Sequence, residues 1–375
     1  MKRIGIIGGG QLAWMMADGA KKLGLELIVQ TPKKDDPAVS IAEDVVLAAV
    51  NNVEATEILA TRCDVITFEN EFVDLDGLSL LEKQGICFRP KLAALSPLLD
   101  KYHQRCYLQD LGLPVPQFFA VESLTNIESQ IKNWQFPIVL KARRLGYDGQ
   151  GTFIINDLTT LSTIVSQSNT HLIEEFVPFT KELAIIATRS VNGEIVTYPV
   201  VETQQQQQVC RRVIAPADIT PNQAAEIFAI AHKILNSLEV IGTFGIELFI
   251  TADGKILINE IAPRTHNSGH FSIDACVTSQ FEQHLRAVAG LPLADTSLTV
   301  PSAVMVNLLG YENSQSDYQT KRQQLSAIPH TYVHWYGKTE SRPGRKLGHV
   351  TILLEQPHSD LESVIQAIES IWYPD

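Results

Sequence analysis

The residues best suited to chemistry lie together in one stretch, from Asn259 to His270. It begins at the end of an apolar, strand-like run over residues 255–261, which Pro263 interrupts. The loop that follows contains guanidinium, imidazole, amide and hydroxyl groups. Function concentrates in loops, and this density of polar groups directly after a buried strand predicts a site for a metal ion and an anionic substrate. A polar surface loop without function is the alternative interpretation.

A carboxylate on a neighbouring strand is predicted to face Glu260. Two strand-like runs flank Asp253-Gly254, which is typical of a β-hairpin. If Asp253-Gly254 forms a two-residue turn, Glu247 lies directly opposite Glu260, with the two side chains about 5 Å apart on one face. A hard cation such as Mg²⁺ would relieve the repulsion between them. Side-chain alternation places Asn259 on the other face, so its ligation would require a twist, and a longer turn would shift the register.

A glycine-rich segment predicts contacts with phosphate groups. Residues 146–152 contain three glycines between strands predicted at 137–141 and 153–155. This spacing is typical of a flap whose backbone amides fold over phosphates, with a plain glycine hairpin as the alternative. No Gly-Lys-Ser/Thr opens a helix here, so the segment is not a Walker A loop. Lys141, at the end of the preceding strand, would supply a positive charge to phosphate oxygens.

The N-terminal third predicts a parallel sheet covered by helices, because strands and helices alternate. The strands are predicted at residues 2–7, 25–30, 44–50, 65–68 and 86–89, and the helices at 11–23 and 53–61. Gly8-Gly9-Gly10 precedes the first helix, where backbone amides would form a phosphate cradle. Dinucleotide binding is disfavoured because no acidic residue closes the second strand. Glu69-Asn70-Glu71 follows a strand, at the sheet edge where α/β proteins bind ligands, or else forms a solvated turn.

The rest of the chain predicts a mixture of helices and antiparallel strands. Helices are predicted at residues 98–111, 124–133, 221–238, 278–289 and 359–372, and strands at 115–120, 172–177, 181–189, 195–203, 303–308, 332–336 and 348–354. The five glutamines at 204–208 predict a solvated loop. Residues 338–349 form a basic turn in an acidic protein, whose cations would reach a phosphate or bicarbonate.

Composition limits the functional classes. A chain of 375 residues is long enough for two or three domains, and its net charge of -12 argues against a general nucleic-acid binder. Its five cysteines are scattered, without a Cys-x-x-Cys pair, which fits a reducing compartment. No signal peptide or long apolar run is evident, so we expect a soluble, cytoplasmic protein without membrane contact.

Taken in order, these motifs resemble those of the ATP-grasp carboxylate–amine ligases. Within that superfamily, residues 146–151, 264–270 and 342–349 are similar to the family of ATP-dependent 5-(carboxyamino)imidazole ribonucleotide synthases of purine biosynthesis. The resemblance covers nearly the whole chain and implies a three-domain architecture of α/β and α+β class. A Rossmann-like pre-ATP-grasp domain would span residues 1–96, and an ATP-grasp domain 97–292, with a mobile flap subdomain at about 115–180. A small C-terminal β-rich domain would span 293–375.

The resemblance implies an ATP-dependent carboxylation. ATP would phosphorylate bicarbonate to carboxyphosphate, and the amine of 5-aminoimidazole ribonucleotide would be carboxylated, with release of ADP and phosphate. It further implies Mg²⁺ or Mn²⁺ as the metal, a homodimer, and no nucleic-acid partner. Another ATP-grasp ligase, such as a formate-using glycinamide ribonucleotide transformylase or a biotin carboxylase, is an alternative. A non-catalytic nucleotide-binding protein is another, which the presence of Lys141, Glu247 and Glu260 disfavours.

The resemblance also assigns roles to individual residues. The ATP-binding residues would be Lys101, Lys141, Gly146, Tyr147, Asp148, Gly149, Gln150, Gly151, Thr152, Glu174, Glu175, Phe176, Val177, Glu182, Asn259 and Glu260. The metal ligands would be Glu247, Glu260 and Asn259. The ribonucleotide-binding residues would be Gly10, Gln11, Leu12, Glu71, Tyr147, Asn267, Ser268, Lys338, Arg345 and Lys346. The catalytic residues would be Asp148, His270, Arg264 and Lys346, with Asp148 and His270 handling the proton that the amine loses.

Two segments depart from the family pattern. The first glycine turn continues Gln11-Leu12-Ala13-Trp14, where the family usually has Gly and Arg after Leu. A charge contact from that helix is therefore in doubt. The family often carries a histidine near the nucleotide where this chain has its glutamine run, so Gln205 or Gln206 is expected to take that place.

Overall fold

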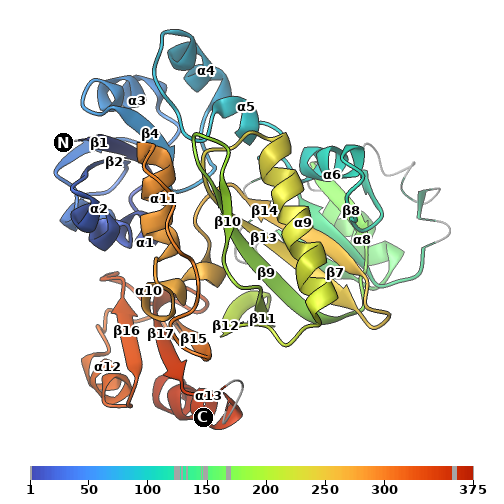
Figure 1. Ribbon diagram of the computed structural model, residues 1–375. Helices are drawn as coiled ribbons and strands as arrows, with labels where there is room; N and C mark the ends of the chain where they lie inside the picture. Colours follow the sequence, from blue (N-terminus) through green and yellow to red (C-terminus); the bar gives the residue numbers. More distant parts are fainter. Residues whose placement is uncertain are drawn as a thin grey trace.

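The computed structural model describes residues 2–121, 127, 130–131, 134–144, 146, 151–165, 170–356 and 361–374. Within these residues the strands form three sheets. In Figure 1 the N-terminal sheet lies at the upper left, the C-terminal elements at the lower left, and the small sheet with β7 and β8 at the right. None of the described helices is long and apolar enough to cross a membrane.

The N-terminal sheet is parallel, in the order β3-β2-β1-β4. Its strands are β1 (Arg3–Ile7), β2 (Glu26–Thr31), β3 (Asp44–Leu47) and β4 (Val65–Phe68), and its helices are α1 (Gln11–Trp14), α2 (Ala17–Leu23), α3 (Val53–Ala60) and α4 (Leu75–Lys83), with a 3₁₀ turn η1 (Pro37–Ser40). These four strands and α3 confirm the sequence prediction. Gly24, with φ of 65°, ends α2 in the left-handed conformation that glycine adopts readily.

Two predictions for this region are wrong, and one helix was missed. The helix predicted over 11–23 is two helices, because the N–H of Met16 bonds to Ala13 O rather than to the residue four positions back. The strand predicted at 86–89 is a single bridge between Ile66 and Phe88. Helix α4 was not predicted, although Asp74 caps its N-terminus by accepting from the N–H of Gly77.

A small antiparallel sheet follows, in the order β5-β8-β6-β7. It contains β5 (Phe118–Ala120), β6 (Ile138–Ala142), β7 (Thr152–Ile155) and β8 (His171–Glu175), with α5 (Leu92–Leu95), α6 (Lys101–Asp110) and α8 (Leu158–Val165) nearby. Helix α6 begins three residues later than predicted, because Asp100 accepts from the N–H groups of Tyr102 and His103. The helix predicted at 124–133 falls mostly outside the described residues.

The largest sheet has nine strands and carries the predicted site. Its main path runs β14-β13-β9-β11-β12-β15-β17-β16, and β10 pairs with β9. The strands are β9 (Phe179–Arg189), β10 (Ile195–Thr197), β11 (Val201–Gln206), β12 (Val209–Ala215), β13 (Gly242–Thr251), β14 (Ile256–Ala262), β15 (Ser302–Leu309), β16 (Thr331–Trp335) and β17 (Lys346–Leu354). The C-terminal strands therefore extend the same sheet, through pairing of β15 with β12.

The glutamine run is not the solvated loop that we predicted. Gln204, Gln205 and Gln206 belong to β11 and pair with β12, and only Gln207 and Gln208 form the connecting turn. Both turn residues have positive φ, at 51° and 62°. The polar composition did not prevent strand formation, because β12 supplies hairpin partners for the backbone. The exposed end of a strand can carry polar side chains on both faces.

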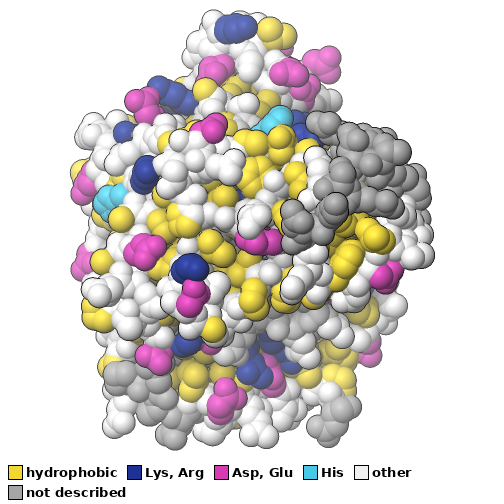
Figure 2. Space-filling view, turned by 90° about the vertical axis from the view of Figure 1, so that its right-hand side faces the viewer, with side chains coloured by type: hydrophobic (Ala, Val, Ile, Leu, Met, Phe, Trp, Pro, Cys, Tyr) yellow, Lys and Arg dark blue, Asp and Glu magenta, His cyan; other side chains and the backbone are white. Residues whose placement is uncertain are grey.

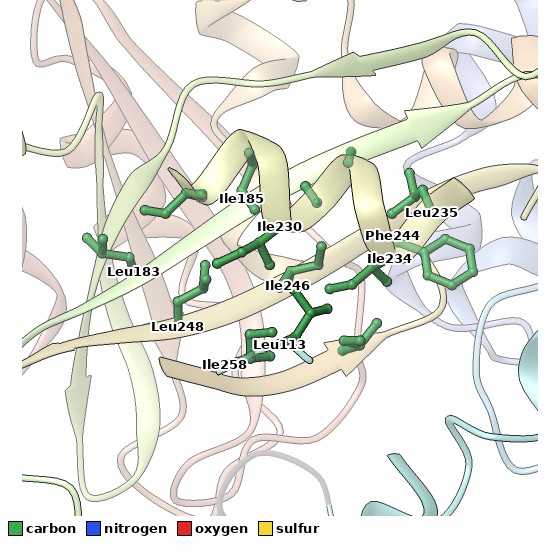
Figure 3. Close-up of a cluster of buried hydrophobic side chains, with 14 of the residues drawn as sticks. Leu113, Leu183, Ile185, Ile230, Ile234, Leu235, Phe244, Ile246, Leu248 and Ile258 are labelled. Carbon is green, nitrogen blue, oxygen red and sulfur yellow. The ribbon is translucent and has the colours of Figure 1, made fainter. Parts of the chain in front are cut away.

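Helix α9 (Pro221–Ser237) covers one face of the large sheet. A capping box of Thr220 and Gln223 begins the helix. Its buried face packs on β9 and β13, and Figure 3 shows Ile230, Ile234 and Leu235 lying against Ile185, Ile246 and Leu248. This apolar layer covers one face of β9 and β13. The polar side chains of the predicted site lie on the opposite face.

The remaining helices join the sheets. Helix α11 (Gln280–Ala289) lies between the N-terminal and the large sheet, and its Phe281, Leu285 and Val288 share a core with β1. The segment before it contains η2 (Asn267–Gly269) and α10 (Ser272–Ala275), and the C-terminal strands carry α12 (Gln319–Ser326) and α13 (Leu361–Trp372).

Figure 2 shows hydrophobic side chains gathered on the face at the right of Figure 1, where β7 and α8 expose Phe153, Ile154 and Leu158.

Candidate active site

Glu247 and Glu260 are register partners across β13 and β14, as predicted. The route to that pairing differs from the predicted one. The hairpin turn has three residues, since the N–H of Thr251 bonds to Lys255 O and Leu248 pairs with Ile258. A β-bulge then leaves Asn259 unpaired and restores the register at Glu260. The longer turn and the bulge cancel each other.

The bulge also turns the Asn259 side chain toward the two carboxylates. Its Nδ2 donates to Glu247 Oε2 at 3.2 Å, and its Oδ1 accepts from Lys141 Nζ at 2.9 Å. Lys101 pairs with Glu260. Two carboxylates, a carboxamide and two ammonium groups from four separate elements therefore meet at one place, which is a donor set suited to a hard cation and the phosphates that it accompanies.

A buried carboxylate, Glu174, holds the cations of this site in position. Its Oε1 accepts from Arg105 Nε at 2.5 Å, and its Oε2 pairs with Lys141 Nζ at 2.7 Å. Arg105 also donates to the backbone oxygen of Asn259 at 2.5 Å, so it fixes the bulge. Burial alone would raise the pKa of Glu174, but the adjacent Arg105 and Lys141 cations lower it to about 2. Glu174 is therefore ionised at neutral pH.

The carboxylates at the centre of the site behave differently. Burial and the neighbouring Glu260 raise the pKa of Glu247 to about 7. Burial and Glu247 raise the pKa of Glu182, on the adjacent strand β9, to about 8. Burial would also raise the pKa of Glu260, but Lys101 and Lys141 bring it below its usual value. Glu182 and Glu247 thus resist ionising together, and a bound cation would compensate the negative charge that their ionisation creates.

The predicted nucleotide residues 175–177 follow Glu174 at the end of β8. Val177 is buried, Phe176 is exposed, and Glu175 accepts from the backbone N–H of Gln117 at 2.9 Å. Phe179 and Phe249 stack with ring centroids 4.6 Å apart. Gln205 donates to Glu182 at 3.2 Å, so the glutamine run reaches the site through strand β11.

Part of the predicted flap falls outside the described residues, namely Tyr147, Asp148, Gly149 and Gln150. The described ends of the flap are Gly146, Gly151 and Thr152. Gly151 has φ of 82° and its carbonyl accepts from the N–H of Ala142. Thr152 pairs with Lys141, so the flap leaves the small sheet beside the predicted phosphate lysine.

The polar loop after β14 is held mainly by hydrogen bonds and ion pairs to other segments of the chain. Arg264 forms a two-point contact with Glu71, from Nε at 2.7 Å and Nη2 at 3.2 Å. Asn267 and Asn307 exchange amide hydrogen bonds at 2.7 and 3.0 Å. Ser268 contacts Nδ1 of His266, and Nε2 of the same imidazole ring lies 3.3 Å from Glu247. The loop therefore connects the carboxylate pair to the N-terminal and C-terminal strands.

The hydrogen-bond network defines the tautomer of His270. Gln280 Oε1 accepts from the backbone N–H of His266, so its Nε2 is the donor to His270 Nδ1 at 3.1 Å. The proton of neutral His270 therefore lies on Nε2. Burial and the nearby Lys346 and His266 hold the pKa of His270 well below its usual range. His270 is thus a neutral hydrogen-bond donor, which does not suit the proton-accepting role that we expected for it.

The first glycine turn is already occupied by a side chain. Glu69, at the end of β4, accepts from the backbone N–H groups of Gly10 and Leu12, and a β-carbon at Gly10 would collide with its carboxylate. Burial raises the pKa of Glu69, against the effect of nearby Arg264. Helix α1 is only four residues long. The arrangement does not favour a phosphate at these amides.

The basic turn contributes residues unequally. Lys346 is 9% exposed, and its charge reaches both Glu247 and His270. Lys338 Nζ donates to the backbone oxygen of Lys346 at 2.8 Å, which places it beside that residue. Arg345 donates to Glu340 O at 2.6 Å, on the exposed side of the turn. Lys346 is the member closest to the candidate site.

Three residues important for this geometry were not predicted, namely Arg105, Gln280 and Asn307. Glu69 and His266 lie in segments that the sequence singled out, although no role was assigned to either residue. One signal was available for Arg105, which lies four residues after Lys101 and hence on the same face of α6. The others act through contacts between residues far apart in the chain, which spacing does not reveal.

Three family comparisons match consecutive parts of the chain. Residues 1–97 match the ribonucleotide synthetase preATP-grasp domain, 106–281 the ATP-grasp domain, and 303–363 the phosphoribosylaminoimidazole carboxylase C-terminal domain. N5-carboxyaminoimidazole ribonucleotide synthase of Synechocystis is 53% identical over 388 residues, covering 99% of this chain and 98% of the relative. The chain belongs to the N5-carboxyaminoimidazole ribonucleotide synthase family of ATP-grasp proteins.

Solved structures of this synthase family agree with the fold. An ADP complex of N5-carboxyaminoimidazole ribonucleotide synthetase is 37% identical, with a TM-score of 0.91 over 99% of this chain and 97% of that one. The synthase of Aspergillus clavatus in complex with ADP and 5-aminoimidazole ribonucleotide is 28% identical, with a TM-score of 0.90 over 99% and 98% of the two chains.

Proposed function

We propose that the protein catalyses the ATP-dependent carboxylation of 5-aminoimidazole ribonucleotide by bicarbonate, which yields 5-(carboxyamino)imidazole ribonucleotide, ADP and phosphate. The observation that carries this proposal is the Glu247–Glu260 pair. This pair lies between the lysines of the proposed nucleotide side and the polar loop of the chain that would bind the ribonucleotide. Membership of the synthase family and the ligands of solved relatives support the choice of substrates.

Lys141 and the residues around it form the nucleotide half of the proposed site. Lys141 would contact phosphate oxygens as a point charge, since Glu174 and Asn259 already orient its ammonium group. The phosphates would be covered by Gly146, Gly151 and Thr152, together with the flap residues that the structure does not describe. Glu175, Phe176 and Val177 would contact adenine, and Glu182 the ribose. Because Gln205 already bonds to Glu182, it would take the place of the family's histidine.

Glu247, Glu260 and Asn259 would hold a divalent cation, either Mg²⁺ or Mn²⁺. The site fits such an ion, because two carboxylates face each other and a cation would offset the burial and mutual repulsion that raise the pKa of Glu247 to about 7. A bound ion offsets the negative charge of transferred phosphate. The residues of the chain then align ATP against bicarbonate, and phosphoryl transfer depends chiefly on that positioning and on electrostatics.

The polar loop and the basic turn would form the ribonucleotide half. Arg264, with Glu71 as its fixed partner, would contact the substrate or carboxyphosphate. Ser268, Lys338, Arg345 and Lys346 would complete the contacts. Asn267 would act mainly by shaping the loop, because its amide is engaged by Asn307. Of the first glycine turn, the side chain of Gln11 remains the proposed contact, since Glu69 occupies the amides of Gly10 and Leu12.

Proton transfer is assigned to Asp148 rather than to His270. Carboxylation of an amine releases a proton, and a carboxylate at the reacting nitrogen would accept it. His270 would instead donate from Nε2, which suits an anionic group such as carboxyphosphate. Lys346, whose charge reaches His270, would stabilise the same anion. Three members of the catalytic set, Arg264, His270 and Lys346, would therefore bind negative charge, and Asp148 would move the proton.

The proposed function is tested by product formation from labelled bicarbonate. The protein is supplied with ATP, Mg²⁺, ¹³C-bicarbonate and 5-aminoimidazole ribonucleotide, and the carbamate carbon is followed by NMR together with ADP release. We expect ADP release to require both bicarbonate and the ribonucleotide. Turnover only with glycinamide ribonucleotide and formate would instead assign a transformylase. Nucleotide binding without turnover on either substrate would indicate a binding protein. Replacing Mg²⁺ by Mn²⁺ tests the identity of the metal, and sedimentation tests the proposed homodimer.

A further inference from the structure

Asp274, His334 and His349 form a second group of potential metal ligands. Asp274 belongs to α10, His334 to β16 and His349 to β17. One ligand atom from each residue lies within 4.8 Å of those of the other two. Glu247 and Glu260 are not among them, and this second group contains nitrogen donors where the first contains oxygen donors. The proposed carboxylation does not use it.

Asp274 and His334 already form a pair that an ion could enter. His334 Nε2 lies 2.9 Å from Asp274 Oδ2, and the side chains are 22% and 8% exposed. Two ligands of a tetrahedral ion with bonds of about 2.0–2.1 Å lie only slightly farther apart than this. A metal ion would therefore replace the shared proton with little movement of the backbone.

His349 provides the second, independent observation. It is fully buried, and its Nε2 has no hydrogen-bond partner among the described residues. Its other nitrogen, Nδ1, lies 2.8 Å from the hydroxyl of Tyr336. With Nδ1 as the donor, Nε2 carries a lone pair. A histidine that ligates a metal through one nitrogen typically donates from the other in the same way.

We propose that Asp274, His334 and His349 bind a transition-metal ion of the zinc class, with water at a fourth position. Two imidazoles and one carboxylate suit Zn²⁺, whereas Mg²⁺ prefers oxygen ligands. The rings of His334 and His349 stack with centroids 4.5 Å apart and planes 17° apart, so one must tilt to direct both lone pairs at one ion. His334, at the more exposed end, is the ring that would tilt.

The ion would tie α10 to the C-terminal strands beside the polar loop. His349 lies with its ring centroid 5.2 Å from that of His270. Asp274 follows His270 by four residues, and the N–H of Ile273 bonds to His270 O. Bound metal would therefore restrain the loop while leaving the nucleotide side unchanged. We expect it to raise the thermal midpoint of the protein without competing with ATP.

Equilibrium dialysis with zinc chloride tests this site in the full-length protein. Excess Mg²⁺ and ADP in all samples would keep zinc from Glu247 and Glu260. Cobalt substitution would report the ligands, since a sulfur-to-cobalt charge-transfer band would reveal binding to cysteine instead. The variants are His334→Gln and Asp274→Asn. His330→Asn is the matched control, because His330 is exposed outside the cluster and Asn tolerates its positive φ of 56°.

The expected result is one zinc per chain, a cobalt spectrum without the sulfur band, and at least tenfold weaker binding in His334→Gln and Asp274→Asn. The control should bind as the parent protein does. The proposal is overturned if no zinc binds, if the sulfur band dominates, or if the control loses as much affinity as the two variants. Asp274→Asn keeps the test decisive should His334→Gln not fold. Carboxylation activity is not needed for any of these readings.

Discussion

Asn259 donates to Glu247 from a strand position that regular alternation would point to the opposite face. The bulge that makes this possible is held by Arg105, which binds the backbone oxygen of Asn259. Arg105 in turn is anchored by Glu174 on another sheet. The shape of the carboxylate pair thus depends on a contact between two sheets, so disturbances in the small sheet should be felt at the proposed metal site.

Glu260→Gln should lower kcat/KM by roughly 100-fold or more, because it removes half of the proposed cation site while keeping the shape of the side chain. Steady-state ADP release over a range of Mg²⁺ concentrations measures the effect. Asp253→Asn, in the turn of the same hairpin, is the control and should retain activity. Normal turnover by Glu260→Gln would contradict the assignment of this pair to the metal.

The affinity for Mg²⁺ should rise between pH 6 and pH 8. The pKa of Glu247 is about 7 and that of Glu182 about 8, both above the ordinary value for a carboxyl. Protons must leave before an ion binds, so binding strengthens as the pH increases. Without metal the sign reverses. Raised carboxyl pKa values contribute stability that is complete below the unfolded value of 4.5 and is lost as the pH rises through about 7 to 8.

Thermal unfolding at pH 6, 7 and 8, with and without Mg²⁺ and ADP, measures both trends. The metal-free protein should become less stable across this range, and the stabilisation by metal and nucleotide should grow. Glu247→Gln should flatten both trends. A parent protein with the same Mg²⁺ stabilisation at pH 6 and pH 8 would show that these carboxyls do not bind the ion.

Glu174→Gln should destabilise the protein by about 3–5 kcal/mol, because it leaves Arg105 and Lys141 as buried cations without their charged partner. Urea unfolding measures the change. Glu175→Gln is a matched control on the adjacent residue, whose carboxylate lies at a more exposed position. Equal effects of the two substitutions would mean that the Glu174 cluster carries no special weight.

Glu69→Ala should raise the KM for the ribonucleotide and cost about 1–3 kcal/mol of stability, because it leaves the amides of Gly10 and Leu12 without their acceptor. Substrate saturation curves and urea unfolding measure the two effects. A lower KM would contradict this prediction. It would show that Glu69 competes with the substrate phosphate for these amides.

Spacing predicted the parts of this protein that depend on neighbouring residues. The parallel strands of the N-terminal sheet follow from apolar runs, and the hairpin that joins β13 to β14 from Asp253-Gly254. The partner of Glu260 was predicted correctly although the turn length was wrong, because the bulge at Asn259 compensated for the extra turn residue. Bulges depend on tertiary support, here from Arg105, and leave no mark in the alternation pattern.

Two segments have partners in the structure that their sequence patterns do not reveal. The glutamine run has the composition of a loop, but β12 offers backbone partners to Gln204, Gln205 and Gln206. The glycine turn has the spacing of a phosphate cradle, and its binding of phosphate stays a prediction, because the Glu69 carboxylate lies at the same amides. In both places another segment of the chain bonds to the backbone, which is the next strand for the glutamines and Glu69 for the glycine turn. A sequence pattern indicates which partner a segment can bind. It does not identify another segment of the chain that binds there instead.

The pairing of β12 with β15 has a practical consequence for anyone who divides the chain into expression fragments. A fragment that stops before Ser302 exposes the backbone edge of β12, next to the buried side chains of Val213 and Ile214. An unprotected edge of this kind recruits strands from other molecules and promotes aggregation. The complementary fragment carries the matching edge of β15. The two pieces should therefore be insoluble when produced separately and recover solubility when produced together.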